Sequence, residues 1–320
     1  MSVLVFVELD EGKIKKSSQE AIFYGAKVAE MMGTSATAVV VGGADQGELA
    51  TAGNFGATKV LHAADSKLNE PNGMAYASVV AAAAQQEGAK VVVLAKSSLA
   101  DAMAARLAGK LKAGLAANVI DLPELSSGFR VKRSIYTGKA FAFTDLTADT
   151  KILAIKKNTI EVAETGGSAS VEAFSPALND GDFGLKVTNT EKATGDVLLP
   201  EADLVVSAGR GLKGPENWGI VEDLARALGA ATACSKPVSD LDWRPHHEHV
   251  GQTGIKVSPN LYIAAGISGA IQHLAGVNSS KVLVVINKDP EAPFFKSADY
   301  GIVGDVFEVL PRLTKAVQAL

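Results

Sequence analysis

This 320-residue chain is poor in cysteine, in aromatic residues and in long apolar runs, and each scarcity excludes a class of protein. Its one cysteine, Cys234, excludes an intramolecular disulfide framework and any zinc or iron–sulfur site built from several thiolates. The longest apolar run, residues 79–84, is too short to span a bilayer. Because the formal net charge is only -4, we expect no nucleic-acid binding, and because the apolar runs are short, we expect no direct insertion into a membrane.

The residues that are abundant favour two α/β domains. Hydrophobic residues make up 47% of the chain, with alanine and valine prominent, while aromatic residues make up 6%. This mixture is typical of parallel sheets covered by close-packed helices, and the chain is longer than one core usually serves. No basic leader precedes the first apolar run at residues 3–7, which indicates a strand rather than a signal peptide and a cytoplasmic protein.

Short β-branched runs alternate with amphipathic stretches through the first half of the chain. Strands are expected at 3–7, 36–41, 59–61 and 90–94, and helices at 18–32, 47–53, 74–86 and 101–111. Residues 129–143 instead alternate with period two around Thr137 and Gly138, which predicts an antiparallel hairpin. With further strands at 152–155 and 171–174, the N-terminal domain is predicted as a parallel sheet with an antiparallel extension at one edge.

A polar stretch from residue 179 to 195 is the best linker candidate, so we place the domains at 1–190 and 191–320. A second series of strands and helices follows it, with strands expected at 203–207, 231–234, 261–264, 282–286 and 300–302. The C-terminal domain is therefore predicted as an open parallel sheet of the Rossmann-like or flavodoxin-like kind.

The second series opens on a glycine-rich turn, GRGLKG at residues 209–214, directly after a strand. Glycines permit a tight bend, and a following helix offers free amides to a pyrophosphate, although a turn without any ligand fits the same pattern. A nicotinamide site would also need an acidic residue at the end of the next strand. That strand instead ends in Cys234, Ser235 and Lys236, which disfavours a nicotinamide dehydrogenase.

A second candidate site lies at VGQTG, residues 250–254, and at GISGAIQH, residues 266–273. A strand leads into Gly266, Ser268 is expected to be the N-cap of the next helix, and the small residues allow a ligand to approach it. His273 lies one turn further along. A lone histidine beside a helix is more often a packed core residue than a functional one, but the adjoining turn favours a functional role here.

These motifs resemble those of the α subunit of electron-transfer flavoproteins. The resemblance rests on GRGLKG, VGQTG, the run LYIAAGISGAIQHLAGVNSSKVLVVIN, INKDPEAP and ADYGIVGD, in that order. It is close from residue 202 to the C-terminus and only architectural before that. The resemblance implies that the C-terminal domain binds flavin adenine dinucleotide (FAD).

Position by position, the resemblance implies a set of FAD contacts. Arg210 would reach the phosphate region, and Thr253 would lie near the reactive ring nitrogen. His273 would lie against the pyrimidine end of the flavin, where a cation or hydrogen-bond donor raises the reduction potential. The full set is Arg210, Ser235, Lys236, Val250, Gly251, Gln252, Thr253, Ser268, Gly269, Ala270, Ile271, Gln272 and His273, with Asn287 and Asp305 at the adenosine half.

Position 236 departs from the family pattern, in which an arginine follows the serine. Here the residue is Lys236, and Pro237 follows it. Both side chains carry one positive charge, but guanidinium is a planar fork that stacks on aromatic rings, whereas ammonium is a compact, strongly hydrated charge. We therefore expect Lys236 to stabilise the added negative charge of the reduced flavin less than arginine would.

Other patterns indicate no catalytic or metal site. His246, His247 and His249 beside Glu248 lack the i, i+4 spacing of helical metal ligands, so a solvated loop is the favoured interpretation. Cys234 is expected to be a small buried residue at a strand end rather than a reactive thiol. No order of serine, histidine and acid and no pair of carboxylates indicates catalysis.

The resemblance implies an electron carrier rather than an enzyme. The flavin would accept electrons from dehydrogenases, such as the acyl-CoA dehydrogenases of fatty acid β-oxidation. It would pass them singly to a membrane quinone oxidoreductase, and the chain would work as a heterodimer with a β subunit, on which the N-terminal domain packs. The alternatives are a flavin-dependent oxidoreductase acting directly on a small substrate, for which His273 is the one candidate acid or base, and an adenine-nucleotide-binding module without a redox role.

Overall fold

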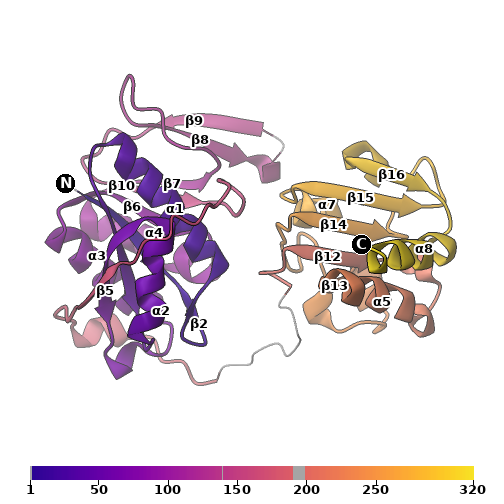
Figure 1. Ribbon diagram of the computed structural model, residues 1–320, viewed down its shortest axis with the longest axis horizontal. Coiled ribbons are helices and arrows are strands. Elements are labelled where there is room, and N and C mark those ends of the chain that lie inside the picture. The colour runs from indigo at the N-terminus through magenta and orange to yellow at the C-terminus, as the bar shows by residue number, and fades with distance from the viewer. Residues whose placement is uncertain (1, 139, 190–198) are drawn as a thin grey trace. The chain divides into compact units, whose positions relative to one another are not determined.

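The computed structural model describes residues 2–138, 140–189 and 199–320 (Figure 1). Contacts within the chain divide it into two compact units, Met1–Thr190 and Glu191–Leu320. Residues 190–195 of the predicted linker lie outside the described residues. Each unit is built around its own large sheet, so each has a separate hydrophobic core.

The described residues of the N-terminal unit form a nine-stranded sheet in the order β11-β5-β4-β1-β6-β10-β7-β8-β9. Every residue of the central strand β1 is buried, because helices cover both faces of this sheet. The strands are β1 (Ser2–Val7), β4 (Ala36–Val41), β5 (Ala57–Ala63), β6 (Ala89–Ala95), β7 (Gly114–Val119), β8 (Arg130–Ile135), β9 (Ala140–Asp145), β10 (Lys151–Ile155) and β11 (Ser170–Ala173).

The predicted hairpin is confirmed, because β8 and β9 pair antiparallel at one edge of the sheet, next to β7. The later strands are not a further extension of that edge. β10 lies inside the sheet and pairs parallel with both β6 and β7, while β11 pairs parallel with β5 at the opposite edge. Strand β7 was not predicted, since Gly114 and Asn118 weaken its strand pattern.

Helices lie on both faces of the N-terminal sheet. α1 (Lys16–Met31) packs against one face, and α3 (Gly73–Gln86) and α4 (Ser98–Leu111) pack against the other. Two of these helices begin at side-chain caps: Asn72 accepts hydrogen bonds from the amides of Met74 and Ala75, and Ser97 accepts one from Ala100. The short helix α2 (Gln46–Ala50) completes the predicted series.

The described part of the C-terminal unit forms a five-stranded parallel sheet in the order β13-β12-β14-β15-β16. Read in chain order this is 2-1-3-4-5, the flavodoxin-like arrangement, so the predicted fold class is confirmed. The strands are β12 (Leu204–Ala208), β13 (Ala231–Cys234), β14 (Leu261–Ala265), β15 (Val282–Asn287) and β16 (Tyr300–Val303).

Different helices and loops pack against the two faces of the C-terminal sheet. α5 (Gly219–Leu228) and α8 (Val306–Gln318) lie side by side on one face, as Figure 1 shows. The other face is covered by α7 (Ile271–Val277) together with Phe294 and Val257. The short helix α6 (Lys236–Ser239) follows β13 directly.

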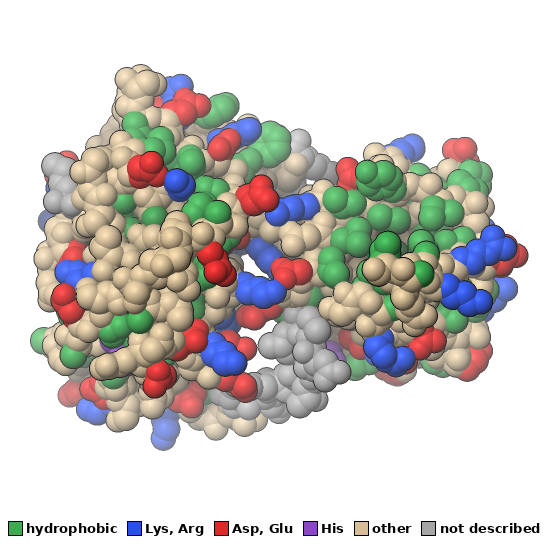
Figure 2. All heavy atoms as spheres, viewed as in Figure 1, with side chains coloured by type: hydrophobic (Ala, Val, Ile, Leu, Met, Phe, Trp, Pro, Cys, Tyr) green, Lys and Arg blue, Asp and Glu red, His purple; other side chains and the backbone are tan. Residues whose placement is uncertain are grey.

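Acidic and basic side chains are interspersed on the face of the molecule that Figure 2 shows, rather than gathered by sign. Among the described residues, no helix combines the length and the apolar character that crossing a membrane requires. The same part of the chain holds no group of three or more histidine, cysteine, aspartate or glutamate residues that could bind a metal ion.

Candidate functional site at the carboxyl ends of the second sheet

The strand order of the C-terminal unit has a switch point between β12 and β14. From β12 the chain moves outward to β13 on one side, and then returns to place β14 on the other side. In open α/β sheets, ligands bind outside the carboxyl ends of the strands at such a switch point. The predicted residues Arg210, Ser235, Ser268, Asn287 and Asp305 all follow the carboxyl ends of these strands.

The turns that follow β12 and β14 are in direct backbone contact, because both are built from glycine. A Cβ atom at Gly209 would overlap the carbonyl oxygen of Gly266, and one at Gly211 would lie 2.7 Å from the Gly266 Cα. The Gly211 amide donates to the Gly266 carbonyl over 3.1 Å, and Gly266 has a left-handed φ of +62°. The glycines therefore bring bare backbone together at the switch point.

The turn at residues 250–253 is held between β13 and α7. The Val250 amide donates to the Cys234 carbonyl over 3.0 Å, and the Gln252 amide donates to the Gln272 carbonyl over 2.7 Å. A Cβ atom at Gly276 of α7 would lie 2.6 Å from the Gly251 Cα, so the turn and the helix touch through glycine. The sequence motif GQTG thus lies beside the loop that follows β14.

The loop between β14 and α7 leaves its amides free. Within the described residues, the backbone amides of Ser268, Gly269 and Ala270 donate no hydrogen bond. Consecutive free amides form a concave site that suits an anion. The predicted N-cap at Ser268 is wrong: Gly269 adopts a left-handed φ of +80°, so α7 begins later and its N-cap position is Ala270.

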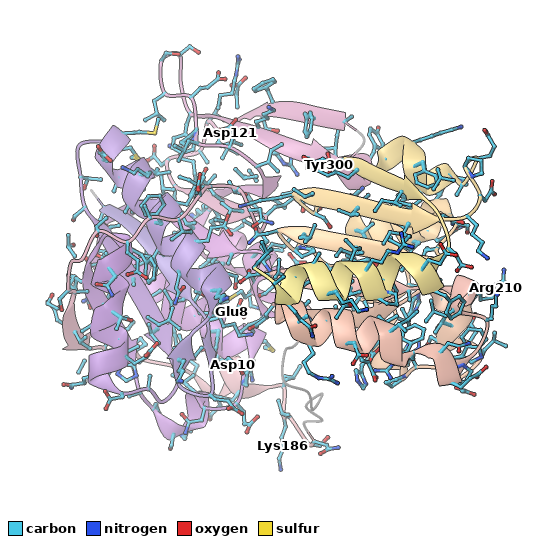
Figure 3. All side chains as sticks on the ribbon, turned by 45° about the vertical axis from the view of Figure 1, so that its right-hand side comes forward. Glu8, Asp10, Asp121, Lys186, Arg210 and Tyr300 are labelled. Carbon is cyan, nitrogen blue, oxygen red and sulfur yellow. The ribbon has the colours of Figure 1, made fainter. Side chains whose placement is uncertain are left out.

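The predicted residues other than Asn287 and Asp305, which are half-buried, form two groups by exposure. The buried group consists of Ser235, Val250, Gly251, Gly269 and His273. Side chains that a ligand could contact are exposed, namely Arg210, Lys236, Gln252, Thr253, Ser268, Ala270, Ile271 and Gln272. The Ile271 side chain is 67% accessible and offers an apolar surface to a planar ring. Figure 3 shows Arg210 at the surface of this unit.

His273 lies under this surface in an aromatic cluster. Its ring contacts Phe294 edge to face at 5.6 Å, and its Nε2 atom lies 3.0 Å from the Tyr262 hydroxyl. Burial lowers the pKa of His273 to about 4, so the ring is neutral at pH 7 and can act as a hydrogen-bond donor but not as a cation. Its Nδ1 atom is buried and has no hydrogen-bond partner among the described residues.

The burial of His273 predicts acid sensitivity of this unit. The pKa of His273 falls from 6.5 when unfolded to about 4 when folded, so its stabilising contribution is complete above pH 6.5 and is lost toward pH 4. We expect the free energy of unfolding to fall by about 3 kcal/mol across this range from this group alone. Urea unfolding of wild type and His273→Gln at pH 7 and pH 4 measures the difference. Equal pH dependence in both proteins would contradict a buried neutral ring.

The remaining predicted residues already have partners within the chain. Lys236 forms an ion pair with Asp240 at 2.6 Å, one turn along α6. Asn287 donates to the Ile267 carbonyl over 3.0 Å and accepts from the Asp289 amide. Asp305 caps α8 through the Phe307 amide and pairs with Lys288 at 2.6 Å. Asn287 and Asp305 therefore shape the loops after β15 and β16.

The expectation of a solvated loop at the histidine-rich segment is wrong for its last residues. Glu248 is 8% exposed and His249 is 2% exposed. Arg244 binds Glu248 with two hydrogen bonds of 2.6 and 2.9 Å, binds Glu222 of α5 over 2.8 Å, and lies over the Trp218 ring at 5.4 Å. We call these four residues, Trp218, Glu222, Arg244 and Glu248, the Arg244 cluster. The i, i+4 spacing of Arg244 and Glu248 was a signal for it in the sequence.

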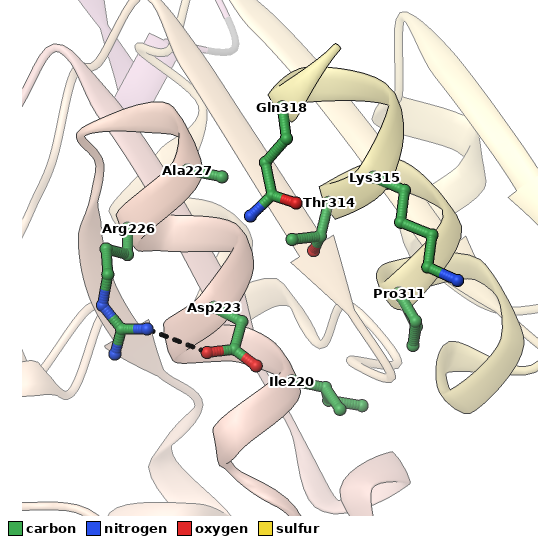
Figure 4. Close-up of a pocket in the computed structure, with 8 residues that line it drawn as sticks. All are labelled: Ile220, Asp223, Arg226, Ala227, Pro311, Thr314, Lys315 and Gln318. Carbon is green, nitrogen blue, oxygen red and sulfur yellow. Dashed lines mark hydrogen bonds and ion pairs between the residues drawn. The ribbon is translucent and has the colours of Figure 1, made fainter.

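Cys234 is buried at the end of β13, as predicted, and burial raises the pKa of its thiol to about 12. A groove of about 590 Å³ between α5 and α8 is a different feature (Figure 4). The ion pair between Asp223 and Arg226 on its wall is 59% and 76% exposed, and the buried Thr314 hydroxyl already donates to the Leu310 carbonyl, so these polar groups are poorly placed to orient a ligand. None of the predicted site residues lines it.

Comparison with known proteins agrees with this geometry. A family model described as "Electron transfer flavoprotein FAD-binding domain" matches residues 198–278, and one described as "Electron transfer flavoprotein domain" matches residues 3–179. An electron transfer flavoprotein subunit alpha of Bacillus subtilis is 38% identical over 324 residues, which covers 99% of this chain and 98% of that protein. The chain belongs to the electron transfer flavoprotein α subunit family.

Other relatives extend the likeness across the full length of this α subunit. The subunit alpha of Syntrophomonas wolfei is 38% identical over 98% of this chain, and that of Mycobacterium leprae is 38% identical over 99%. The predicted resemblance is thus confirmed, and it includes the N-terminal half, where the motifs indicated architecture alone. The match of the FAD-binding domain assigns FAD as the cofactor of the C-terminal unit.

The residues present fit that cofactor. The amides of residues 268–270 are free to bind a diphosphate, and they lie next to the bare glycine backbone at the switch point. The buried Nδ1 atom of His273 still lacks a partner among the described residues. Ile271, Gln252 and Thr253 are exposed around the same turns.

Proposed function

We propose that this α subunit carries FAD for electron transfer within a heterodimer and has no metabolite substrate of its own. The observation that carries the proposal is the run of free amides at residues 268–270, next to the two glycine turns at the switch point of the C-terminal sheet. FAD supplies the chemistry, since a flavin takes up two electrons together and releases them singly. What this chain supplies is binding, orientation and control of charge around the ring.

The roles of the residues follow from their chemistry. The amides of residues 268–270 and the Arg210 guanidinium would bind the diphosphate. Thr253 and Gln252 would present a hydroxyl and an amide to the edge of the flavin, with Ser235 and Val250 beneath them. Asn287 and Asp305 would lie at the adenosine half. His273, as a neutral donor, would stabilise charge that develops on the ring.

The partner proposed for this chain is an electron transfer flavoprotein β subunit, on which the N-terminal domain, residues 1–190, would pack. The proposed donors are dehydrogenases such as acyl-CoA dehydrogenases, and the proposed acceptor is a membrane quinone oxidoreductase. Family membership supports the carrier role. The donor, the acceptor, fatty acid β-oxidation as the setting and a cytoplasmic location stay predictions.

The experiment is co-expression with a β subunit, purification and counting of flavins per heterodimer from blue and near-ultraviolet absorbance. Reduction of the flavin is then followed with an acyl-CoA substrate alone and with the substrate plus its dehydrogenase. We expect reduction only when the dehydrogenase is present. Reduction by the acyl-CoA alone would support the alternative, a flavin-dependent oxidoreductase, and a colourless protein would contradict both.

Substitutions around Lys236 test the control of charge. Asp240 partly neutralises the Lys236 ammonium at 2.6 Å, and both side chains are more than half exposed. Lys236→Arg and Asp240→Asn are each expected to raise the reduction potential of the bound flavin, most clearly at low ionic strength. Redox titration measures this, with Lys281→Arg, at the amino end of β15, as the control. An unchanged potential in both variants would remove Lys236 from the flavin environment.

A further inference from the structure

His249 lies directly beneath the turn at residues 250–254. It forms a parallel bridge to Cys234, and its carbonyl accepts a hydrogen bond from the Ile255 amide over 2.8 Å. A Cβ atom at Gly254 would lie 2.8 Å from the Cγ and Nδ1 atoms of its ring, and one at Gly251 would lie 3.3 Å from its Nε2 atom. The ring therefore fills the space under the turn, and it fits because both positions above it are glycine.

The His249 ring is enclosed. It is 2% exposed, and its Nδ1 atom has no hydrogen-bond partner among the described residues. A charged imidazolium would bring a second proton and a hydration shell into this closed space, which is costly without partners. The packing is consequently compatible with the neutral ring and unfavourable to the protonated one.

The burial and charges around His249 together favour its neutral form. His246 contacts it edge to face at 5.5 Å, and His273 of α7 is close enough for the two imidazoles to influence each other's charge. Of the charged groups on α6, Asp240 is already paired with Lys236. The Cys234 thiol is neutral, because burial raises its pKa to about 12. Burial lowers the pKa of His249, His246 and Lys236 lower it further, and Asp240 opposes them.

We propose that His249 is a positioning residue for the FAD-binding turn, which holds the turn closed with a neutral ring and releases it when the ring is protonated. The inference rests on the proposed placement of FAD against Gln252 and Thr253. FAD binding and protonation of His249 then oppose each other, so each lowers the affinity for the other by the same factor.

The sign of the pH dependence follows from the lowered pKa. The contribution of the closed turn is complete above the ordinary histidine value of 6.5 and is lost as the pH falls below it. We expect the dissociation constant for FAD to be constant above pH 6.5 and to rise as the pH falls below it, by at most about tenfold per pH unit from one linked proton. His273 stays neutral across this range, because its pKa is about 4.

The test is FAD titration of the flavin-depleted full chain, with its partner subunit, from pH 8 to pH 5.5. His249→Gln is expected to flatten the pH profile, since the amide is uncharged at every pH. His247→Gln, an exposed histidine of the same loop, is the matched control and should retain the wild-type profile. A His249→Gln profile that superimposes on wild type, or equal flattening by His247→Gln, overturns the inference.

Two further measurements distinguish an error in the placement of FAD from an error in the role of His249. Gly276→Ala pushes the turn from the α7 side, so an unchanged FAD affinity at pH 8 would overturn the placement of FAD itself. Weakened binding there, with an unaltered profile in His249→Gln, overturns the role of His249 alone. If His249→Gln fails to fold, histidine NMR of wild type decides: a lower His249 pKa with FAD bound supports the inference, and equal values overturn it.

Discussion

Replacing Gly209 with alanine is expected to weaken FAD binding by about 10- to 100-fold and to lower the free energy of unfolding of the C-terminal unit by about 1–3 kcal/mol. The backbone at Gly209 has a φ of −118°, which alanine adopts without strain, so the cost comes from space alone. The added methyl group would overlap the Gly266 carbonyl and lie 2.9 Å from the Ile267 Cγ1 atom. The turns after β12 and β14 would have to separate.

Gly219→Ala is the matched control for this substitution. Gly219 lies in the same unit, at the start of α5, and a Cβ atom there would have open space within 4 Å. We expect Gly219→Ala to keep wild-type FAD affinity and to stabilise α5 by up to about 1 kcal/mol, because alanine is the better helix former. Isothermal titration with FAD and urea unfolding measure both effects. Wild-type affinity in Gly209→Ala would contradict the contact between the two turns.

Removing Arg244 is expected to destabilise the C-terminal unit by about 2–3 kcal/mol. Arg244→Ala leaves the buried Glu248 carboxylate without its two hydrogen bonds, and also removes the cation from the Trp218 ring. His249 and the turn at residues 250–253 follow Glu248 directly, so FAD affinity should fall as well. Both tryptophans of the chain, Trp218 and Trp243, lie in this unit, so tryptophan fluorescence during urea unfolding reports on it.

The controls for Arg244→Ala distinguish the loss of a buried ion pair from the loss of an arginine charge in general. Arg226→Ala removes an exposed i, i+3 ion pair with Asp223 and should change stability by no more than about 0.5 kcal/mol. Adding Glu248→Gln to Arg244→Ala should restore part of the lost stability, because an amide is cheaper to bury unpaired than a carboxylate. If Arg226→Ala costs as much as Arg244→Ala, the Arg244 cluster has no special role.

Much of the fold could be predicted from local pattern. Wholly apolar runs such as 36–41 mark buried parallel strands, and period-two alternation marks the hairpin of β8 and β9. Local pattern did not predict pairing between strands that are far apart in the chain. The sequence of residues 151–155 fits an edge strand as well as an inner one, yet β10 lies between β6 and β7. Sequence periodicity does not show which strands pair with one another, so the strand order could not be predicted from it.

The residues of the candidate site could be predicted in part, because many of them stand in local sequence motifs. Its glycines, hydroxyls and His273 stand in compact motifs, and those motifs resemble a family whose membership the comparisons established. Ser268 was misassigned as a cap, because a left-handed Gly269 delays the helix. Arg244 and His249 were missed, since charged and imidazole side chains in a loop usually face solvent.

By itself, the sequence determined the class of the fold, the family and the cofactor, because these depend on residue type and local order. Only the tertiary structure decided which turns touch, that His273 is neutral, that Lys236 is paired with Asp240, and that His249 is sealed beneath the turn. These properties arise from burial and from contacts between segments far apart in the chain. Burial sets the protonation state of a histidine, and the residue type alone does not say whether the side chain is buried.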